Sequence, residues 1–421
     1  GATGERVSLG AGAEARGEPF HVEIAGDVRA AVTRWSDALP ARTPLGAPLA
    51  VELGWNSWYE LWDGVDEQAV RDNAARAAEV LGPWARDGRV IRIVVDDGWQ
   101  VRWGEWEPNA KFPSGLDGLA RDLRADGFRM GVWLAPLLVD ADSALVAEHP
   151  DWFVGDASYV HAKNGEMRIL DVTHPDAADH LAGVIRRLVG WGYDLLKIDF
   201  LFAGTFEGER REDVTGMEAY ARALSIVREA AGEETLLLAV GAPDVASLPW
   251  ADAWRAGPDI ALEPFGPSWP FVTNEARALG ARWPICRRVA CDGDPPLLRG
   301  LTEPEVSAGA WVAAFAGGAF FLSDDLRSLD DARLPWGLDD ARVGVALAGE
   351  PSVPADPFPE SPPDALVNAL TDHFGRDHAS THVVPRIWTL PSGGRVALNT
   401  GDSDLVVETT TVPPRSVVPL P

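Results

Sequence analysis

Cysteine and long apolar runs are scarce in this chain of 421 residues. Cys286 and Cys291 are its two cysteines; they are too few for a disulfide scaffold and match no metal-site spacing, so we expect both to be thiols. No apolar run reaches the length of a membrane span. Residues 1–5 lack the basic and apolar regions of a signal peptide, which predicts a cytoplasmic protein.

Positive charge is also in short supply. The chain has 37 lysines and arginines against 64 aspartates and glutamates, a net charge of −27. This charge repels nucleic acids and anionic membranes, so the expected partner is a neutral small molecule or oligosaccharide. Solubility alone would also account for the acidity, and a homo-oligomer is left open. Tryptophan is abundant, with 18 residues against 4 tyrosines, as is common where sugar rings are stacked.

Strand and helix patterns alternate between about residues 50 and 325. Their number and order predict an α/β fold, a (β/α)8 TIM barrel. A doubly wound sheet is the competing architecture, but no glycine-rich phosphate loop follows any strand. The strand candidates are Leu49–Leu53, Ile91–Val95, Met130–Leu134, Tyr193–Ile198, Thr235–Val240, Ala251–Trp254, Arg288–Ala290 and Ala319–Leu322. The helical patterns are Asp66–Val80, Leu116–Ala125, Ala177–Val189, Thr215–Ala231 and Glu303–Phe315.

The two ends of the chain differ in composition from its centre. The N-terminal end is rich in glycine and alanine, with one strand candidate, Phe20–Ile24, and a short helix at about 28–39. Six prolines in residues 351–363 are typical of a linker, and alternating runs on either side of Gly393-Gly394 indicate a hairpin. The predicted domains are an N-terminal remnant or linker (1–48), a catalytic barrel (49–350) and a small C-terminal antiparallel β-domain (351–421).

The segment 193–200 places Lys197 and Asp199 in an otherwise apolar strand. Side chains two residues apart share one face of a strand, so both are expected at its C-terminal end. Lysine is normally disfavoured in such a strand, and the chain has only three lysines. An ammonium beside a carboxylate lowers the carboxylate's pKa, which keeps an aspartate charged as a nucleophile. A buried structural ion pair is the alternative.

Acidic residues and tryptophans follow nearly every strand candidate, where barrel enzymes carry their chemistry. This ring suits either a metal held by carboxylates or glycoside hydrolysis, in which two carboxylates act and others hold sugar hydroxyls. A lysine beside the central aspartate disfavours a metal, and the tryptophans favour a sugar. Core packing, helix caps and turns are the structural alternatives. The residues are Trp55, Trp58, Tyr59, Asp96, Asp97, Trp133, Lys197, Asp199, Arg255, Asp259, Asp292, Asp294, Asp324 and Asp325.

These residues lie in ordered motifs that resemble the clan-D α-galactosidases, most closely glycoside hydrolase family 36. The resemblance covers about residues 50–330. It implies a melibiase-like, retaining exo-α-galactosidase that needs no cofactor and no metal. The motifs are Trp55-Asn56-Ser57-Trp58, Val95-Asp96-Asp97-Gly98-Trp99, Gly131-Val132-Trp133, Lys197-Ile198-Asp199-Phe200, Arg255-Ala256-Gly257-Pro258-Asp259 and Asp292-Gly293-Asp294-Pro295.

The resemblance also implies a role for each residue at the predicted site. Asp199 would be the nucleophile, with a pKa lowered by Lys197, and Asp259 the general acid/base, with a raised pKa. The remaining positions would bind the terminal α-galactoside. Asp96 and Asp97 would hold its 4- and 6-hydroxyls, Lys197 and Arg255 would hold hydroxyls near the reacting carbon, and Trp58, Tyr59, Trp133 and Gly241 would complete the pocket.

The chain departs from the family pattern beside the expected 2-hydroxyl. Many members have Cys-Gly where this chain has Val240-Gly241, and often Asn where it has Cys291. A valine side chain forms no hydrogen bond, so recognition at C2 stays open. The alternatives are a retaining α-N-acetylgalactosaminidase or β-L-arabinopyranosidase, or a transglycosylase. A non-catalytic carbohydrate-binding pseudoenzyme is the alternative from another class. Family members usually begin with a large β-sandwich, of which residues 1–48 could be only a remnant.

Overall fold

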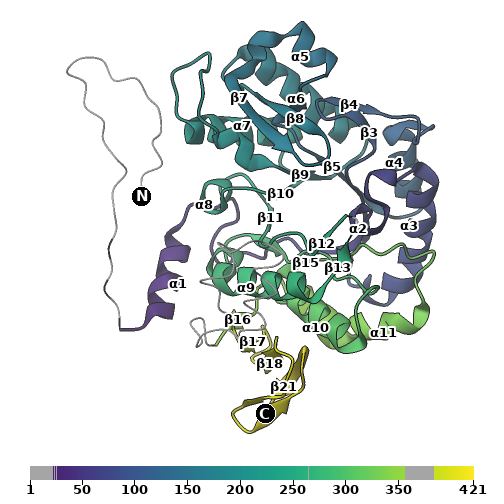
Figure 1. Cartoon of the computed structure of the whole chain (residues 1–421), viewed down its shortest axis with the longest axis vertical. Helices are drawn as coiled ribbons and strands as arrows, with labels where there is room; N and C mark the ends of the chain where they lie inside the picture. Colours follow the sequence, from purple (N-terminus) through teal and green to yellow (C-terminus); the bar gives the residue numbers. More distant parts are fainter. Residues whose placement is uncertain (1–21, 23, 25, 264, 356–383) are drawn as a thin grey trace.

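A closed barrel of eight parallel strands lies at the centre of the protein (Figure 1). The computed structural model describes residues 22, 24, 26–263, 265–355 and 384–421. The barrel strands are β1 (Glu52–Asn56), β2 (Ile91–Val95), β5 (Arg129–Leu134), β9 (Leu195–Ile198), β10 (Leu236–Ala239), β11 (Ala253–Arg255), β14 (Ala290–Asp292) and β15 (Gly317–Leu322). Pairing of β15 with β1 closes the barrel. The predicted TIM barrel is confirmed, and each predicted strand overlaps an observed one.

Helices surround the barrel. The long ones are α3 (Glu67–Leu81), α4 (Gly115–Ala125), α6 (Pro175–Gly190), α7 (Gly216–Ala231), α9 (Trp269–Cys286) and α10 (Glu303–Ala314). All but α9 overlap a predicted helix. Most of the residues of α9 are buried and Pro284 lies inside it, so no polar face marks its period in the sequence. No helix in the described ranges has the length and apolarity of a membrane span.

Shorter helices complete the α-helical and 3-10 elements. The α-helices are α1 (Val28–Ala38), α2 (Trp58–Leu61), α5 (Ala144–Glu148), α8 (Asp244–Ser247), α11 (Leu334–Gly337) and α12 (Asp340–Ala346). The 3-10 helices are η1 (Trp62–Gly64), η2 (Gly82–Trp84), η3 (Pro150–Trp152), η4 (Leu201–Thr205) and η5 (Asp331–Arg333). The helix predicted at about 28–39 is therefore present as α1.

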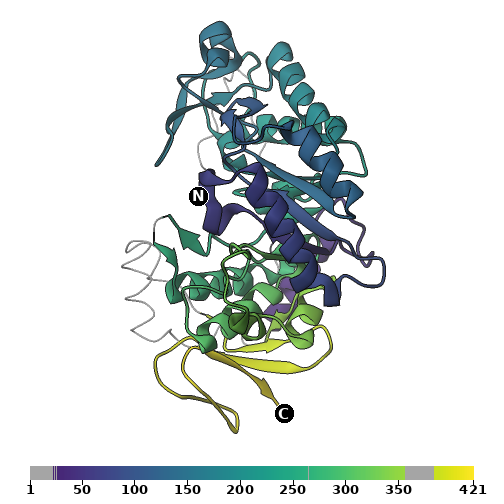
Figure 2. The same ribbon diagram turned by 90° about the vertical axis from the view of Figure 1, so that its right-hand side faces the viewer.

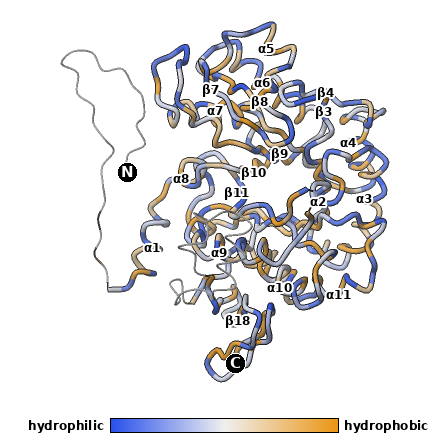
Figure 3. Tube along the Cα trace, in the orientation of Figure 1, coloured by the Kyte–Doolittle hydropathy of each residue, from blue (hydrophilic) through white to orange (hydrophobic). Residues whose placement is uncertain are grey.

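Side chains fill the barrel from its N-terminal end upward. Arg92 is fully buried there, donates to Glu52 over 2.7 Å and pairs with Asp194, so its charge is compensated. Above it lies an apolar cluster that includes Leu195, Leu238 and Phe321. Figure 3 shows apolar segments in the central strands and mixed colouring in the surrounding helices. The filled lower part leaves the C-terminal end of the strands as the place for a site.

Three loops at that end carry extra strands that the sequence analysis did not predict. β3 (Gln100–Arg102) pairs with β4 (Glu105–Pro108) after β2. β6 (Leu138–Asp140), β7 (Phe153–His161) and β8 (Gly165–Leu170) form an antiparallel sheet after β5. β12 (Ala261–Leu262) and β13 (Gly266–Pro267) form a hairpin after β11. These insertions border the mouth of the barrel.

The C-terminal residues form a small antiparallel sheet at one end of the molecule, shown in yellow in Figure 2. Its strands are β16 (Val353–Pro354), β17 (Ile387–Thr389), β18 (Arg395–Asn399) and β21 (Ser416–Leu420), and β19 (Leu405–Val407) pairs with β20 (Thr410–Val412). Pairing of β17 with β18 confirms the predicted hairpin. Trp388 stacks on Phe315 at 4.5 Å, which joins this sheet to the end of α10. The predicted strand Phe20–Ile24 and most of the predicted linker lie outside the described residues, and the domain boundaries stay predictions.

The two cysteines form a disulfide, so the expectation of two thiols is wrong. Cys286 ends α9 and Cys291 lies in β14, with their Cα atoms 5.2 Å apart. A short turn between the two elements brings the thiols together. Two cysteines that are neither a scaffold nor a metal motif can still form a local bond, and here the junction of α9 with β14 brings them together.

Candidate active site

A cavity of about 240 Å³ opens at the C-terminal mouth of the barrel. Five barrel strands or their following loops contribute to its wall. Seven residues proposed from the sequence line it: Trp58, Asp96, Asp97, Trp133, Lys197, Asp199 and Asp259. These seven residues span positions 58 to 259 of the sequence and meet in one site.

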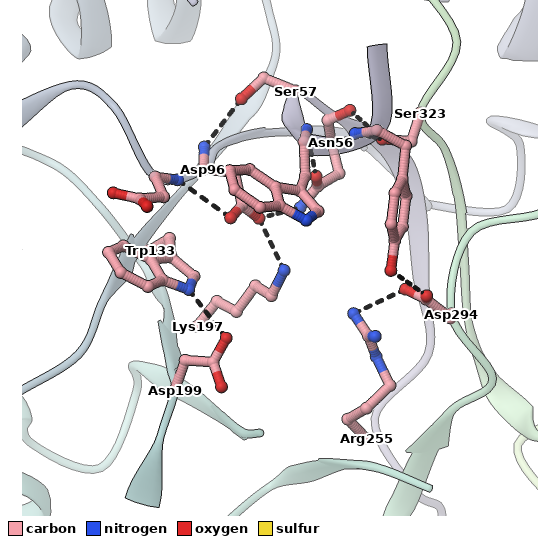
Figure 4. A network of polar contacts seen from close by, with 12 residues as sticks. Asn56, Ser57, Asp96, Trp133, Lys197, Asp199, Arg255, Asp294 and Ser323 are labelled. Atoms are coloured by element: carbon pink, nitrogen blue, oxygen red, sulfur yellow. Dashed lines mark hydrogen bonds and ion pairs between the residues drawn. The ribbon is translucent and has the colours of Figure 1, made fainter. Parts of the chain in front are cut away.

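Asp199 follows β9 and receives two hydrogen bonds. The indole Nε1 of Trp133 donates to Oδ2 over 3.0 Å (Figure 4). The backbone N–H of Phe200 donates to Oδ1 over 2.6 Å. Phe200 has a φ of 52°, which is uncommon for a residue with a side chain. Such strain is often kept at functional sites, and here it accompanies the bond from the Phe200 N–H to its neighbour's carboxylate.

The net pKa shift of Asp199 is opposite to the expected one. Burial raises its pKa, and the ammonium of Lys197 and the indole of Trp133 oppose this without cancelling it. The negative charge of Asp259 adds to the increase. The expectation of a lowered pKa is therefore wrong, although Lys197 acts in the predicted direction.

Lys197 forms its ion pair with Asp96 rather than with Asp199. Its Nζ lies 2.7 Å from Oδ2 of Asp96, and both side chains are buried. Asn56 donates to the same oxygen over 2.7 Å. Burial lowers the pKa of Lys197, but the carboxylates of Asp96 and Asp199 raise it above its ordinary value, so the lysine stays charged between them. Figure 4 shows Lys197 between these two acids.

Asp97 presents a second carboxyl to the cavity. Its Oδ1 accepts hydrogen bonds from Nε2 of Gln100 over 2.5 Å and from the indole Nε1 of Trp103 over 3.1 Å. Burial raises the pKa of Asp97 to about 6, against the effect of these donors. The carboxyl of Asp97 therefore changes from neutral to ionised near pH 6. The strength with which its oxygens accept hydrogen bonds from a ligand changes with it.

Arg255 holds the acidic group on the opposite side of the cavity. Its Nη1 lies 3.3 Å from Oδ1 of Asp259, whose side chain is 48% exposed. The same guanidinium pairs with Asp292 over 3.1 Å and with Asp294 over 2.7 Å. Burial lowers the pKa of Arg255, but these acids raise it well above its ordinary value. One fully charged cation thus anchors three carboxyls, of which only Asp259 faces the cavity.

Asp294 links Tyr59 to the loop that follows Asp259. Its Oδ2 accepts the hydroxyl of Tyr59 and, over 2.9 Å, the backbone N–H of Ile260. Tyr59 and Asp294 are both buried, and neither lies in the wall of this cavity. The contacts fix the backbone beside Asp259. The predicted contact of Tyr59 with substrate stays a prediction, as does that of Arg255.

Two glycines stand where a side chain would disturb the site. Gly241 has a φ of 54°, and a Cβ there would lie 3.4 Å from Oδ1 of Asp199. At Gly257 a Cβ would lie 1.6 Å from Oε2 of Glu275, a buried carboxyl of α9. Burial raises the pKa of Glu275 well above its ordinary value. Gly241 lies outside the cavity wall, and its role in substrate binding stays a prediction.

Several residues in the cavity wall were not predicted. They come mainly from the unpredicted hairpins: Trp62, Trp103, His161, Ala162, Lys163, Phe200, Ala261, Leu262 and Glu263. The rarity of lysine could have pointed to Lys163, and the excess of tryptophan to Trp103. His161 was assigned no role, and its ring lies 4.8 Å from that of Trp103. Within the described residues, no group of three or more His, Cys, Asp or Glu side chains could hold a metal ion.

Residues 62–224 match the melibiase family model. The curated α-galactosidase AgaA from Geobacillus stearothermophilus is 29% identical over 142 residues, which cover 32% of this chain and 18% of AgaA. An α-galactosidase from Escherichia coli is 27% identical over 186 residues, covering 41% of this chain and 25% of that protein. The match thus spans a quarter or less of either relative.

Solved structures extend the likeness over most of the chain. The α-galactosidase TtGalA from Thermus thermophilus, in complex with p-nitrophenyl α-D-galactopyranoside, aligns with a TM-score of 0.61 and 30% identity, covering 76% of this chain and 65% of that one. Its complex with stachyose gives a TM-score of 0.62 and 29% identity, covering 77% and 70%. AgaA, described as a family 36 enzyme, shares the fold at 16% identity and a TM-score of 0.56, covering 90% and 52%. The resemblance predicted from the motifs is confirmed.

Proposed function

We propose, from the premise that this chain carries a melibiase-type barrel of glycoside hydrolase family 36 type, that it is a retaining exo-α-galactosidase. Its substrate is a terminal α-D-galactoside, and neither a metal nor a cofactor takes part. The observation that carries the proposal is that Asp199, which follows β9, and Asp259, in the loop after β11, line one cavity of about 240 Å³. Pockets for drug-sized ligands span about 300–1,000 Å³, so this cavity suits a single sugar ring.

The two aspartates divide the reaction between them. The carboxylate of Asp199 attacks C1 and forms a glycosyl ester, while Asp259 donates its proton to the departing oxygen. Asp259 then takes a proton from water, the resulting hydroxide displaces Asp199 from C1, and the product keeps its anomeric configuration. In retaining enzymes the two carboxyls lie roughly 5–5.5 Å apart. The negative charge of Asp259 raises the pKa of Asp199, and both carboxyls line the same cavity.

The surroundings suit these roles. Trp133 and the N–H of Phe200 hold Asp199 in one orientation, which reduces the reorganisation needed for attack. Asp259 is half-exposed and held by Arg255, so it can reach both the leaving group and an incoming water. The assignment of Asp96 and Asp97 to the 4- and 6-hydroxyls rests on the family resemblance, and both carboxyls face the cavity.

The group at C2 decides between related sugars. Val240 packs in the apolar cluster inside the barrel, and neither it nor Gly241 lines the cavity. The absence of both residues from the wall supports a site that contacts C2 of the sugar differently from the family members that have Cys-Gly at this position. A panel of p-nitrophenyl α-galactoside, α-N-acetylgalactosaminide and β-L-arabinopyranoside distinguishes these substrates. Release from one of the latter two without release from the α-galactoside would replace our first choice.

Substitution of the nucleophile tests the mechanism. In Asp199→Ala, kcat for p-nitrophenyl α-galactoside should fall by a factor on the order of 10⁴–10⁶. Asp179→Ala, an exposed aspartate on α6, is the matched control and should keep wild-type activity. Added azide should restore turnover of Asp199→Ala and give the β-galactosyl azide, because it attacks C1 from the face that Asp199 leaves free. Wild-type turnover no higher than that of Asp199→Ala would instead favour a carbohydrate-binding pseudoenzyme, which isothermal titration with galactose would detect.

A further inference from the structure

Two of the chain's three lysines lie at the mouth of the barrel, beyond the residues that act on the sugar. Lys111 donates a hydrogen bond to the backbone oxygen of Asp63, in the loop after β1. Lys163 lies at the tip of the β7–β8 hairpin, in the insertion after β5. Arginine supplies nearly all other positive charge, so these two lysines are exceptions to the chain's composition.

Lys163 joins three separate loops across the mouth of the cavity. Its Nζ lies 2.9 Å from Oδ2 of Asp63 and 2.9 Å from Oε2 of Glu263. Asp63 follows β1, Glu263 follows β11, and the hairpin itself follows β5. Both Lys163 and Glu263 line the cavity that holds the two catalytic aspartates. We call this arrangement of Asp63, Lys163 and Glu263 the lysine bridge.

The lysine bridge lies on the side from which a leaving group departs. Asp259 protonates the glycosidic oxygen, so the group beyond that oxygen extends past Asp259. The β12–β13 hairpin begins two residues after Asp259, and Glu263 stands four residues after it. A leaving group larger than the sugar pocket therefore meets the hairpin and the bridge.

The bridge also separates two hollows. Lys163 belongs to the wall of the sugar cavity and to that of an adjoining polar cavity of about 290 Å³, which Lys111 also lines. The hairpin tip is held in a compact turn, because Nδ1 of His161 accepts the N–H of Asn164 over 3.1 Å. Asp97 and Trp103 line both cavities as well, so Lys163 is one of three side chains at which the two hollows adjoin.

We propose that Lys163 is a specificity-determining residue whose bridge to Asp63 and Glu263 limits the size of the leaving group. The inference rests on the proposed function, since it concerns what the same site accepts. With the bridge formed, the mouth admits a terminal galactoside with a small leaving group. A long or branched leaving group has to displace the Lys163 side chain, so large substrates react more slowly than small ones.

The ion pairs of the lysine bridge are weak enough to be opened by thermal motion and by salt. The three side chains are 42% to 52% exposed, and ion pairs between such groups are weak and screened by salt. Their disruption should therefore change the discrimination between substrates by about threefold to tenfold rather than abolish activity. Salt should have the same effect as removal of the lysine, because both remove the same attraction.

The test compares one small and one large substrate. The ratio of kcat/KM for stachyose to kcat/KM for p-nitrophenyl α-galactoside should rise about threefold to tenfold in Lys163→Met, which keeps the length of the side chain and removes its charge. In the wild type the ratio should rise between about 0.05 M and 0.5 M NaCl, and in Lys163→Met it should not. Glu263→Gln should raise the ratio in the same direction, and the double variant should add little.

Arg395→Met is the matched control, because it removes one cation from an ion pair with Glu408 in the C-terminal sheet. It should leave the ratio and its salt dependence as in the wild type. An unchanged or lowered ratio in Lys163→Met, with the wild type still active on the small substrate, would overturn this inference and leave the proposed function standing.

A wild type that releases no p-nitrophenol from the galactoside would instead overturn the proposed function. In that case hydrogen exchange of the peptide 157–166 still reports on the bridge. Exchange should be faster in Lys163→Met than in the wild type, and equal exchange would overturn the bridge itself.

Discussion

The hydrogen bond from Trp133 to Asp199 gives a prediction whose size follows from the structure. Trp133→Phe removes the indole N–H that lies 3.0 Å from Oδ2 of Asp199. This donor stabilises the ionised carboxylate, so its loss raises the pKa of Asp199 further above its ordinary value. A hydrogen bond to a charged group contributes about 1.5–3 kcal/mol. One pH unit corresponds to about 1.36 kcal/mol, so the expected increase is about 1–2 units.

The pH dependence of kcat/KM measures this shift. Asp199 has to be ionised to attack C1, and the acidic limb of the profile reports the pKa of an essential base in the free enzyme. In Trp133→Phe this limb should move to higher pH by about 1–2 units, with p-nitrophenyl α-galactoside as substrate. Activity lost at low pH should be partly regained as the pH rises.

Trp106→Phe is the matched control for the loss of packing. Trp106 is also buried, and its ring lies 6.1 Å from that of Trp133. The substitution removes the same atoms from the same aromatic cluster and leaves the bond to Asp199 in place. It should lower stability without moving the acidic limb. An acidic limb that stays fixed in Trp133→Phe, or moves equally in both variants, would refute the reasoning.

Four further outcomes are expected. Because the pKa of Asp97 is about 6, KM of the wild type should rise as the pH falls through about 6, and in Asp97→Asn a higher KM should not depend on pH there. Burial raises the folded-state pKa of Asp199 above its unfolded value of about 3.9, so its ionisation costs stability as the pH rises above that value. Calorimetry should therefore show a higher Tm for Asp199→Asn than for the wild type at neutral pH, and no difference near pH 3. The double variant Cys286→Ser/Cys291→Ser should lose about 2 kcal/mol of unfolding free energy in urea, as the short closed loop implies, and reductant should affect the wild type alone. EDTA should leave activity unchanged; its inactivation of the enzyme would support the metal-dependent alternative.

The regular part of the barrel could be predicted because its signals are local. An apolar run such as Ile91–Val95 needs no distant information to be identified as a buried strand, and its observed bounds are the same. The C-terminal ends of parallel strands meet at one mouth, so Asp96, Asp199 and Asp259 could be brought together without a structure. The contacts among these distant residues thus follow from the topology of the barrel.

The partner of Lys197 could not be predicted in the same way. The sequence places it two residues from Asp199, but closure of the barrel brings Asp96, which follows β2 on the far side of β5, within 2.7 Å of Lys197. The sign of the Asp199 pKa shift depends on burial, which outweighs the lysine, and burial is a property of the whole mouth. Lys163 and Glu263 of the lysine bridge lie at the turns of the β7–β8 and β12–β13 hairpins, whose strands have two to nine residues. The positions of these hairpins over the cavity follow from tertiary packing.

The single guanidinium of Arg255 among Asp259, Asp292 and Asp294 has a consequence for selectivity between states of the sugar. Burial raises the pKa of Asp294 to about 8, and Asp259 carries the proton that it donates, so near neutral pH the guanidinium is balanced rather than outnumbered. An oxocarbenium-like sugar carries positive charge only while the bond at C1 is breaking. With Arg255 balanced in this way, the carboxylate of Asp199 in the cavity wall attracts that short-lived cation and is nearly indifferent to the neutral galactoside, so a galactose mimic with a protonated ring nitrogen should be held far more tightly than galactose itself.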